Sequence, residues 1–173
     1  MNLAVSAIGR DRPGIVAGIT GALLDAGGNV DDSQMSILHG HFAVMLIVSV
    51  DDDSSIAELS LRLDEVGREF GLEGITVAEL TALDRGAGPS HVLTVYAADR
   101  PGIVHEVAEL LAARNVNITD LRTRRTAGET PLYTMMMELA VEGEVSPLAA
   151  ELKRFSDEHQ VEVSLTQLDI EVL

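Results

Sequence analysis

The sequence predicts an α+β protein built from two βαββαβ modules with antiparallel sheets. Three observations support this prediction: a hexapeptide that occurs twice, the same order of helix and strand patterns after each copy, and an apolar composition. Asp-Arg-Pro-Gly-Ile-Val stands at residues 11–16 and again at residues 99–104, an offset of 88. Three further identities keep this offset: Leu23 with Leu111, Asn29 with Asn117, and Asp32 with Asp120. An in-phase repeat of this kind indicates a duplication.

Each copy opens with a short β-branched, apolar segment that suits a buried strand. These segments are residues 2–8 and residues 91–97. A helix is expected next, because Pro13 and Pro101 suit a first helical turn and Asp11 and Asp99 stand just ahead as N-caps. Apolar residues then follow with helical spacing: Ile15, Val16, Ile19, Leu23 and Ala26, and in the second copy Ile103, Val104, Val107, Leu110 and Leu111. Gly27-Gly28 and Asn115 are expected to end these helices.

The remaining elements follow in the same order in both copies. Strands are expected at residues 29–38, 42–50 and 74–80, and at residues 117–123, 132–141 and 161–172. Ser55 to Glu58 is a capping-box pattern that opens one final helix, and Ser146-Pro147 opens the other. This order predicts two ferredoxin-like units, residues 1–83 and 91–173, joined by a linker at residues 84–90 that is rich in Gly and Pro.

Composition excludes several classes of function. The net charge is −16, and it is spread evenly: residues 1–86 carry 14 acidic and 5 basic side chains, and residues 87–173 carry 14 and 7. Because nucleic-acid affinity rests on Lys and Arg neutralising phosphates, we expect no direct nucleic-acid partner, and an anionic membrane surface is disfavoured for the same reason. Without cysteine there is no thiolate metal site and no cysteine nucleophile. No apolar run has the length of a membrane span, so we expect a cytoplasmic protein.

The strand-to-helix turn carries the most informative chemistry. It places backbone N–H groups at a helix N-terminus, where a carboxylate is favoured, and Gly14 or Gly102 lets a ligand approach the backbone closely. Asp11 or Asp99 is a partner for an ammonium group, and the amides of Asn29 and Asn117 can donate and accept. Together these groups suit a zwitterionic amino acid. The alternative stays open that the Asp residues are caps and the Asn residues are turn residues.

These residues carry a resemblance to a known family. The Asp-Arg-Pro-Gly-Ile-Val turn, the Gly-Gly-Asn-Val and Asn-Val-Asn-Ile steps downstream, and Phe-x-x-Met on a later strand resemble the ACT domain family. Two such modules and little else resemble the glycine cleavage system transcriptional repressor family. The resemblance implies amino-acid binding at module interfaces through Asp11, Gly14 and Asn29, and through Asp99, Gly102 and Asn117. Related modules that bind serine tend to carry Asn where this chain has Asp11 and Asp99. The ligand, for which glycine and serine stay open, and the occupancy of both sites therefore do not follow from the resemblance.

Other candidate clusters favour structural interpretations. His39 and His41 have no third metal ligand nearby and are expected in a polar hairpin turn, so no metal site is predicted. Asp51-Asp52-Asp53 is expected as a solvated cluster before a helix start, and Met135-Met136-Met137 as a buried strand. Arg122, Arg124 and Arg125 form the only basic cluster, either a solvated hairpin or a docking point for an acidic partner.

No catalytic constellation, phosphate loop or zinc pattern occurs, so we expect a non-enzyme without a cofactor. The sequence therefore favours a regulatory amino-acid sensor that acts through a protein partner, either a transcription factor or an enzyme, with transcriptional control of the glycine cleavage type. Two alternatives stay open: a purely structural ACT pair, and an accessory module of a metabolic enzyme. A homodimer also stays open.

Overall fold

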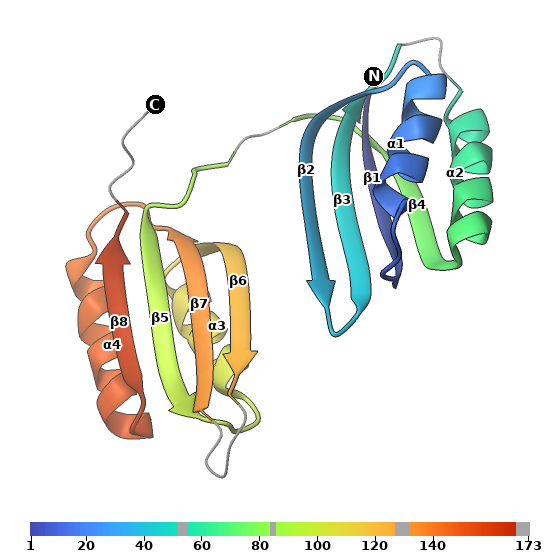
Figure 1. Ribbon diagram of the computed structural model, residues 1–173. Coiled ribbons are helices and arrows are strands. Elements are labelled where there is room, and N and C mark those ends of the chain that lie inside the picture. The colour runs from blue at the N-terminus through green and yellow to red at the C-terminus, as the bar shows by residue number, and fades with distance from the viewer. Residues whose placement is uncertain (52–54, 84–85, 127–131, 169–173) are drawn as a thin grey trace. The chain divides into compact units, whose positions relative to one another are not determined.

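The computed structural model describes residues 1–51, 55–83, 86–126 and 132–168. The chain divides into two units, Met1–Asp84 and Arg85–Leu173, which are described separately below as the first and second modules (Figure 1). The predicted module limits and the linker at residues 84–90 stay predictions, and residues 84 and 85 of that linker lie outside the described residues.

Both modules have the predicted βαββαβ order. The first comprises β1 (Asn2–Arg10), α1 (Ile15–Asp25), β2 (Asn29–Leu38), β3 (His41–Ser49), α2 (Ile56–Phe70) and β4 (Leu72–Leu80). The second comprises β5 (His91–Ala98), α3 (Ile103–Ala113), β6 (Asn117–Arg125), β7 (Leu132–Ala140), α4 (Ser146–His159) and β8 (Glu162–Gln167). The sheets have the orders β2-β3-β1-β4 and β6-β7-β5-β8, with every neighbouring pair antiparallel. The predicted α+β, ferredoxin-like fold is therefore confirmed.

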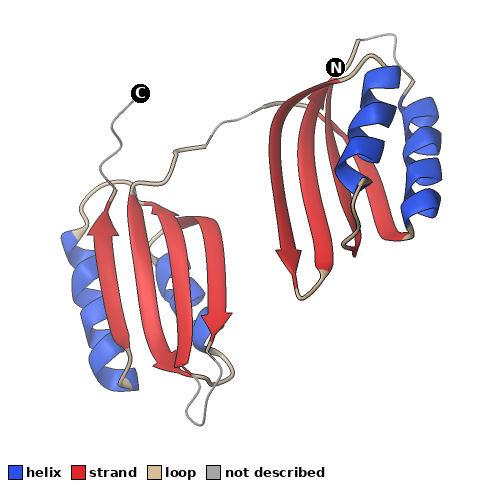
Figure 2. Cartoon of the chain, in the orientation of Figure 1, coloured by secondary structure: helices blue, strands red, loops and turns tan. Residues whose placement is uncertain are grey.

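In each module the two helices cover one face of the sheet (Figure 2). Strand residues alternate accordingly: Leu3 and Val5 of β1 are fully buried, whereas Ile8 on the opposite face is 49% exposed. The methionine run follows the same rule, because Met135 and Met137 are buried and Met136 is 45% exposed. The run expected as a buried strand is therefore buried on one face only, since successive side chains of a strand point to opposite faces.

The helix starts differ from the prediction in one respect. The N-caps are Gly14, with φ 98° and ψ −16°, and Gly102, with φ 95° and ψ −17°, and neither helix has a side-chain cap. Asp11 and Asp99 are therefore not caps, and the prolines precede the helices instead of standing in their first turn. Pro followed by Gly with these angles is the central pair of a type II turn, which explains the later helix start.

Most other boundaries agree with the sequence. Ser55 caps α2 by accepting a hydrogen bond from the Glu58 N–H at 3.3 Å. Gly27 and Asn115 have the positive φ angles, 72° and 56°, that end α1 and α3. The last predicted strand is shorter than expected, Glu162–Gln167, and the end of its predicted range lies outside the described residues.

Candidate functional site

Each repeated turn lines a pocket between the first helix of its module and the neighbouring strands. In the first module the pocket has a volume of ≈ 510 Å³ and is lined by residues 11–17, Thr20, Met35 and Phe42. In the second module the pocket has a volume of ≈ 620 Å³ and is lined by residues 99–105, Ala108 and Tyr133. Both volumes lie within the range of small-molecule sites, roughly 300–1,000 Å³.

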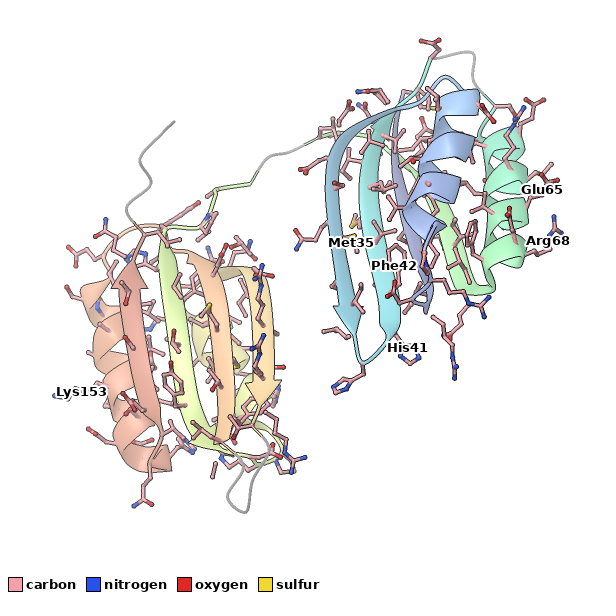
Figure 3. The ribbon with its side chains drawn as sticks, in the orientation of Figure 1. Met35, His41, Phe42, Glu65, Arg68 and Lys153 are labelled. Atoms are coloured by element: carbon pink, nitrogen blue, oxygen red, sulfur yellow. The ribbon has the colours of Figure 1, made fainter. Side chains whose placement is uncertain are left out.

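The first pocket is polar on one side and apolar on the other. Its apolar wall comes from Met35 on β2 and Phe42 on β3, two neighbouring strands (Figure 3). Its polar rim is the turn itself, which is tied to the β2–β3 hairpin by a hydrogen bond from the Asp11 N–H to the Gly40 carbonyl at 3.0 Å. The carboxylate of Asp11 and the guanidinium of Arg12 form no ion pair with any described residue.

The second pocket has the same turn but its charged side chains are paired. Asp99 forms an ion pair with Arg125, whose Nε atom lies 2.9 Å from Asp99 Oδ2. Arg100 donates hydrogen bonds to both carboxylate oxygens of Glu106, the bond to Oε1 at 2.8 Å. The hydrogen bond from Arg100 holds the pKa of Glu106 below its ordinary value, and the positive charge of Arg100 acts in the same direction. The Nδ1 atom of His159 lies 3.2 Å from Arg100 and 3.7 Å from Glu106.

Asn29 and Asn117 do not lie with the turns of their own modules. Asn29 begins β2 and pairs with Ser49, whereas Met35 of the pocket is six residues further along the strand. At about 3.3 Å per residue, Asn29 stands about 20 Å from the pocket. Its amide donates a hydrogen bond to Asp31 Oδ1 at 2.8 Å, near the β-bulge of β2. Asn117 has the equivalent position in β6, opposite Ala140.

Sequence reasoning missed the residues that complete the second turn. Glu106 and His159 were not singled out, and Arg125 was assigned only to a basic hairpin. A signal for Glu106 was present, because the offset of 88 pairs it with Gly18, so that a charged residue replaces a glycine two residues after an identical motif. The ion pair between Arg125 and Asp99 could be predicted only from the strand register, since 25 residues lie between the partners.

The other candidate clusters are the histidine pair and the aspartate run. In the part of the chain that the structure describes, no group of three or more His, Cys, Asp or Glu could hold a metal ion. His39 lies in the two-residue turn before β3, with φ 51°, and both it and His41 are exposed. Asp52 and Asp53 lie outside the described residues. Among the described helices, none is both long and apolar enough to cross a membrane.

Comparisons with known proteins agree with this architecture. Family models described as ACT domains match residues 2–77 and residues 91–157. A UPF0237 protein of Methanopyrus kandleri is 37% identical over 76 residues, which cover 43% of this chain and 84% of that protein. The glycine cleavage system transcriptional repressor of Escherichia coli K12 is 31% identical over 128 residues, 73% of this chain and 66% of the repressor.

Two solved structures match nearly the whole chain. A protein of unknown function from Galdieria sulphuraria superposes with a TM-score of 0.80 at 25% identity, covering 96% of this chain and 98% of that one. A crystal structure of a proposed glycine cleavage system transcriptional repressor has a TM-score of 0.77 at 19% identity and covers 96% of both chains. At that identity the second match shows the shared fold alone.

Proposed function

Because the chain belongs to the ACT domain family and carries two ACT domains in tandem, we propose that it is a non-catalytic regulatory protein that binds a free amino acid. The observation that carries this proposal is the pocket at the first turn, where unpaired opposite charges stand beside a helix N-terminus. The bound state would alter contact with a protein partner. The similarity to the glycine cleavage system transcriptional repressor supports transcriptional control of that type, in the cytoplasm.

The proposed ligand follows from the charges of the pocket. Arg12 and the free N–H groups at the start of α1 favour a carboxylate, and Asp11 favours an ammonium group. Gly14 presents backbone without a Cβ, so a small ligand can approach closely. Glycine and L-serine combine both charges with a small side chain. The apolar wall of Met35 and Phe42 adds a surface for the ligand's carbon atoms.

The net charge of −16 favours a protein as the partner of this chain over a nucleic acid. Phosphate contacts from Lys and Arg dominate nucleic-acid affinity, and this chain has 12 such residues against 28 acidic ones. Regulation of transcription would therefore act through a protein, for which a transcription factor or a metabolic enzyme is proposed. The exposed Arg124 and the Asp120–Arg122 ion pair on β6 offer a charged surface for such a partner.

Asn29 stays in the proposed ligand set with Asp11 and Gly14 on the family resemblance, which points to Asp99, Gly102 and Asn117 as the equivalent residues of the second module. Because Asn29 lies about 20 Å from its own module's pocket and Asn117 has the equivalent position in β6, each would contact a ligand held at the turn of another module. We propose that a second copy of the chain supplies that module, as a homodimer. Sedimentation of the wild-type protein with and without ligand measures whether that dimer exists.

A thermal-shift panel of the proteinogenic amino acids tests the proposal. A ligand present at 100 times its Kd adds roughly 2.7 kcal/mol of stability, which is easily measured. Asp11→Ala should reduce the shift clearly. The matched control is Asp25→Ala, which removes an equally exposed carboxylate at the opposite end of α1. A shift that survives in Asp11→Ala and disappears in Asp25→Ala would contradict the site.

A second function, that of a pairing module without a ligand, is favoured by the outer sheet face of the first module. Ile8 on β1 and Met45 on β3 lie on that face and are 49% and 52% exposed. Apolar patches of this kind mark interaction surfaces. If no amino acid in the panel raises the melting temperature, while Met45→Lys abolishes a measured self-association, this second function replaces the first.

A further inference from the structure

The two turns have identical sequences but different neighbours. At the offset of 88, Gly18 of α1 corresponds to Glu106 of α3, and Ile37 of β2 corresponds to Arg125 of β6. The strand register supports the second equivalence, because Ile37 pairs with Phe42 as Arg125 pairs with Tyr133. Two uncharged positions of the first module are therefore a carboxylate and a guanidinium in the second.

Glu106 pairs with the arginine of the second turn, although its side chain is not among the residues that line the second pocket. It lies in the first turn of α3, where the helix dipole favours an anion. A Cβ at Gly102 would stand 3.5 Å from its Oε1 atom, so the carboxylate lies directly over the turn. Both of its oxygens accept hydrogen bonds from Arg100. The guanidinium of the second turn is thus paired with a carboxylate of the chain itself.

Arg125 pairs with the carboxylate of the second turn, as Glu106 pairs with its guanidinium. Its Nε atom lies 2.9 Å from Asp99 Oδ2, the carboxylate that would otherwise be free for a ligand's ammonium group. Arg125 is exposed, but its partner Asp99 is about two-thirds shielded. Together Glu106 and Arg125 supply the second turn with the two charges that a zwitterion would bring.

The first turn has neither of these partners. Gly18 has no side chain, and the ring of Phe70 fills the space beside it: a Cβ at Gly18 would stand 2.7 Å from that ring. Phe70 is the last residue of α2, and the last residue of α4 is His159, which contacts Arg100 and Glu106. An apolar packing contact in the first module is therefore replaced by a charged cluster in the second.

We propose that the second turn is liganded internally by Glu106 and Arg125, so that a free amino acid binds the chain only at the first turn. This inference rests on the proposed function and adds the stoichiometry: one ligand per chain. Glu106 and Arg125 act as specificity-determining residues that pair the charges of one of two identical turns.

Isothermal titration calorimetry of the full chain with glycine and with L-serine tests this proposal. Wild type should bind one molecule per chain. Asp11→Ala should weaken binding by at least about tenfold, which corresponds to 1.4 kcal/mol, whereas Asp99→Ala should leave the affinity within about twofold. A stoichiometry of two, or equal losses in both variants, would overturn the inference and leave the proposed function standing.

The gain-of-function variant is Glu106→Ala with Arg125→Ala, which removes both internal charges. It should bind two molecules per chain, and a milder pair, Glu106→Gln with Arg125→Gln, covers the case in which the first variant does not fold. If both folded variants still bind one molecule, Glu106 and Arg125 do not close the turn and the inference is wrong. If wild type binds neither probe nor any other amino acid of the panel, the proposed function itself is wrong and the inference falls with it.

Discussion

Alanine at the two N-cap glycines should have unequal costs, although the glycines stand in identical hexapeptides. Gly14 and Gly102 have φ angles of 98° and 95°, so an L side chain is strained at both, by about 1–2 kcal/mol. The surroundings differ. A Cβ at Gly14 would lie 3.0 Å from the Phe70 ring, whereas at Gly102 the nearest atom is the Glu106 carboxylate at 3.5 Å, an ordinary contact. Overpacking against a ring typically costs a further 1–3 kcal/mol.

We therefore expect Gly14→Ala to destabilise the protein by about 2–5 kcal/mol and Gly102→Ala by about 1–2 kcal/mol. Urea denaturation followed by far-ultraviolet circular dichroism measures both. Tyrosine fluorescence reports the second module alone, because the only two tyrosines, Tyr96 and Tyr133, lie there and the chain has no tryptophan. Phe70→Leu in the Gly14→Ala background should recover part of the difference. Equal losses for the two alanine variants would refute the role given to Phe70.

Three further predictions concern charge and ligand binding. Because the hydrogen bond from Arg100 lowers the pKa of Glu106 below its ordinary value of 4.5, the charged pair stabilises the fold above that pH and the contribution is lost as the pH falls through the lowered pKa. Glu106→Gln should therefore lower the denaturation midpoint near neutral pH and have no effect in strong acid; an effect that is independent of pH would contradict this. Asn29→Ala should weaken glycine or L-serine binding about tenfold, measured by calorimetry at concentrations where the chain is dimeric. Unchanged binding would show that Asn29 serves only the local hydrogen bond to Asp31. The protein alone should not bind duplex DNA at physiological salt in a fluorescence-anisotropy titration, because its charge of −16 repels phosphates. Specific binding of DNA without a partner protein would contradict this prediction.

The fold was predictable because its signals are local. Helical spacing, turn residues with positive φ and the alternation of buried strand residues each depend on a few neighbouring positions, and the repeat supplied each signal twice. The helix starts were mispredicted because Pro-Gly has two interpretations. Pro suits both a first helical turn and the second position of a type II turn, and only the φ of Gly14 distinguishes them.

The site was less predictable, because its contacts span the chain. The sequence identified Asp11 and Gly14, which line the first pocket, but grouped them with Asn29. Topology separates these residues: α1 returns the chain to the end of the sheet where β1 starts, so β2 begins far from the turn that follows β1. The partners Glu106 and Arg125 become visible only when helix phase and strand register bring them to residues 99–102.

Identity of the hexapeptide therefore predicts the backbone of a turn but not what the turn can bind. The backbone angles of Gly14 and Gly102 agree within a few degrees, so both turns present the same N–H groups. What differs is the source of the opposing charges. In the second module Glu106 and Arg125 supply them from within the chain, at no cost in bound-ligand entropy. In the first module the corresponding positions are uncharged, so a molecule that carries both a carboxylate and an ammonium group would complement the charges of Asp11 and Arg12.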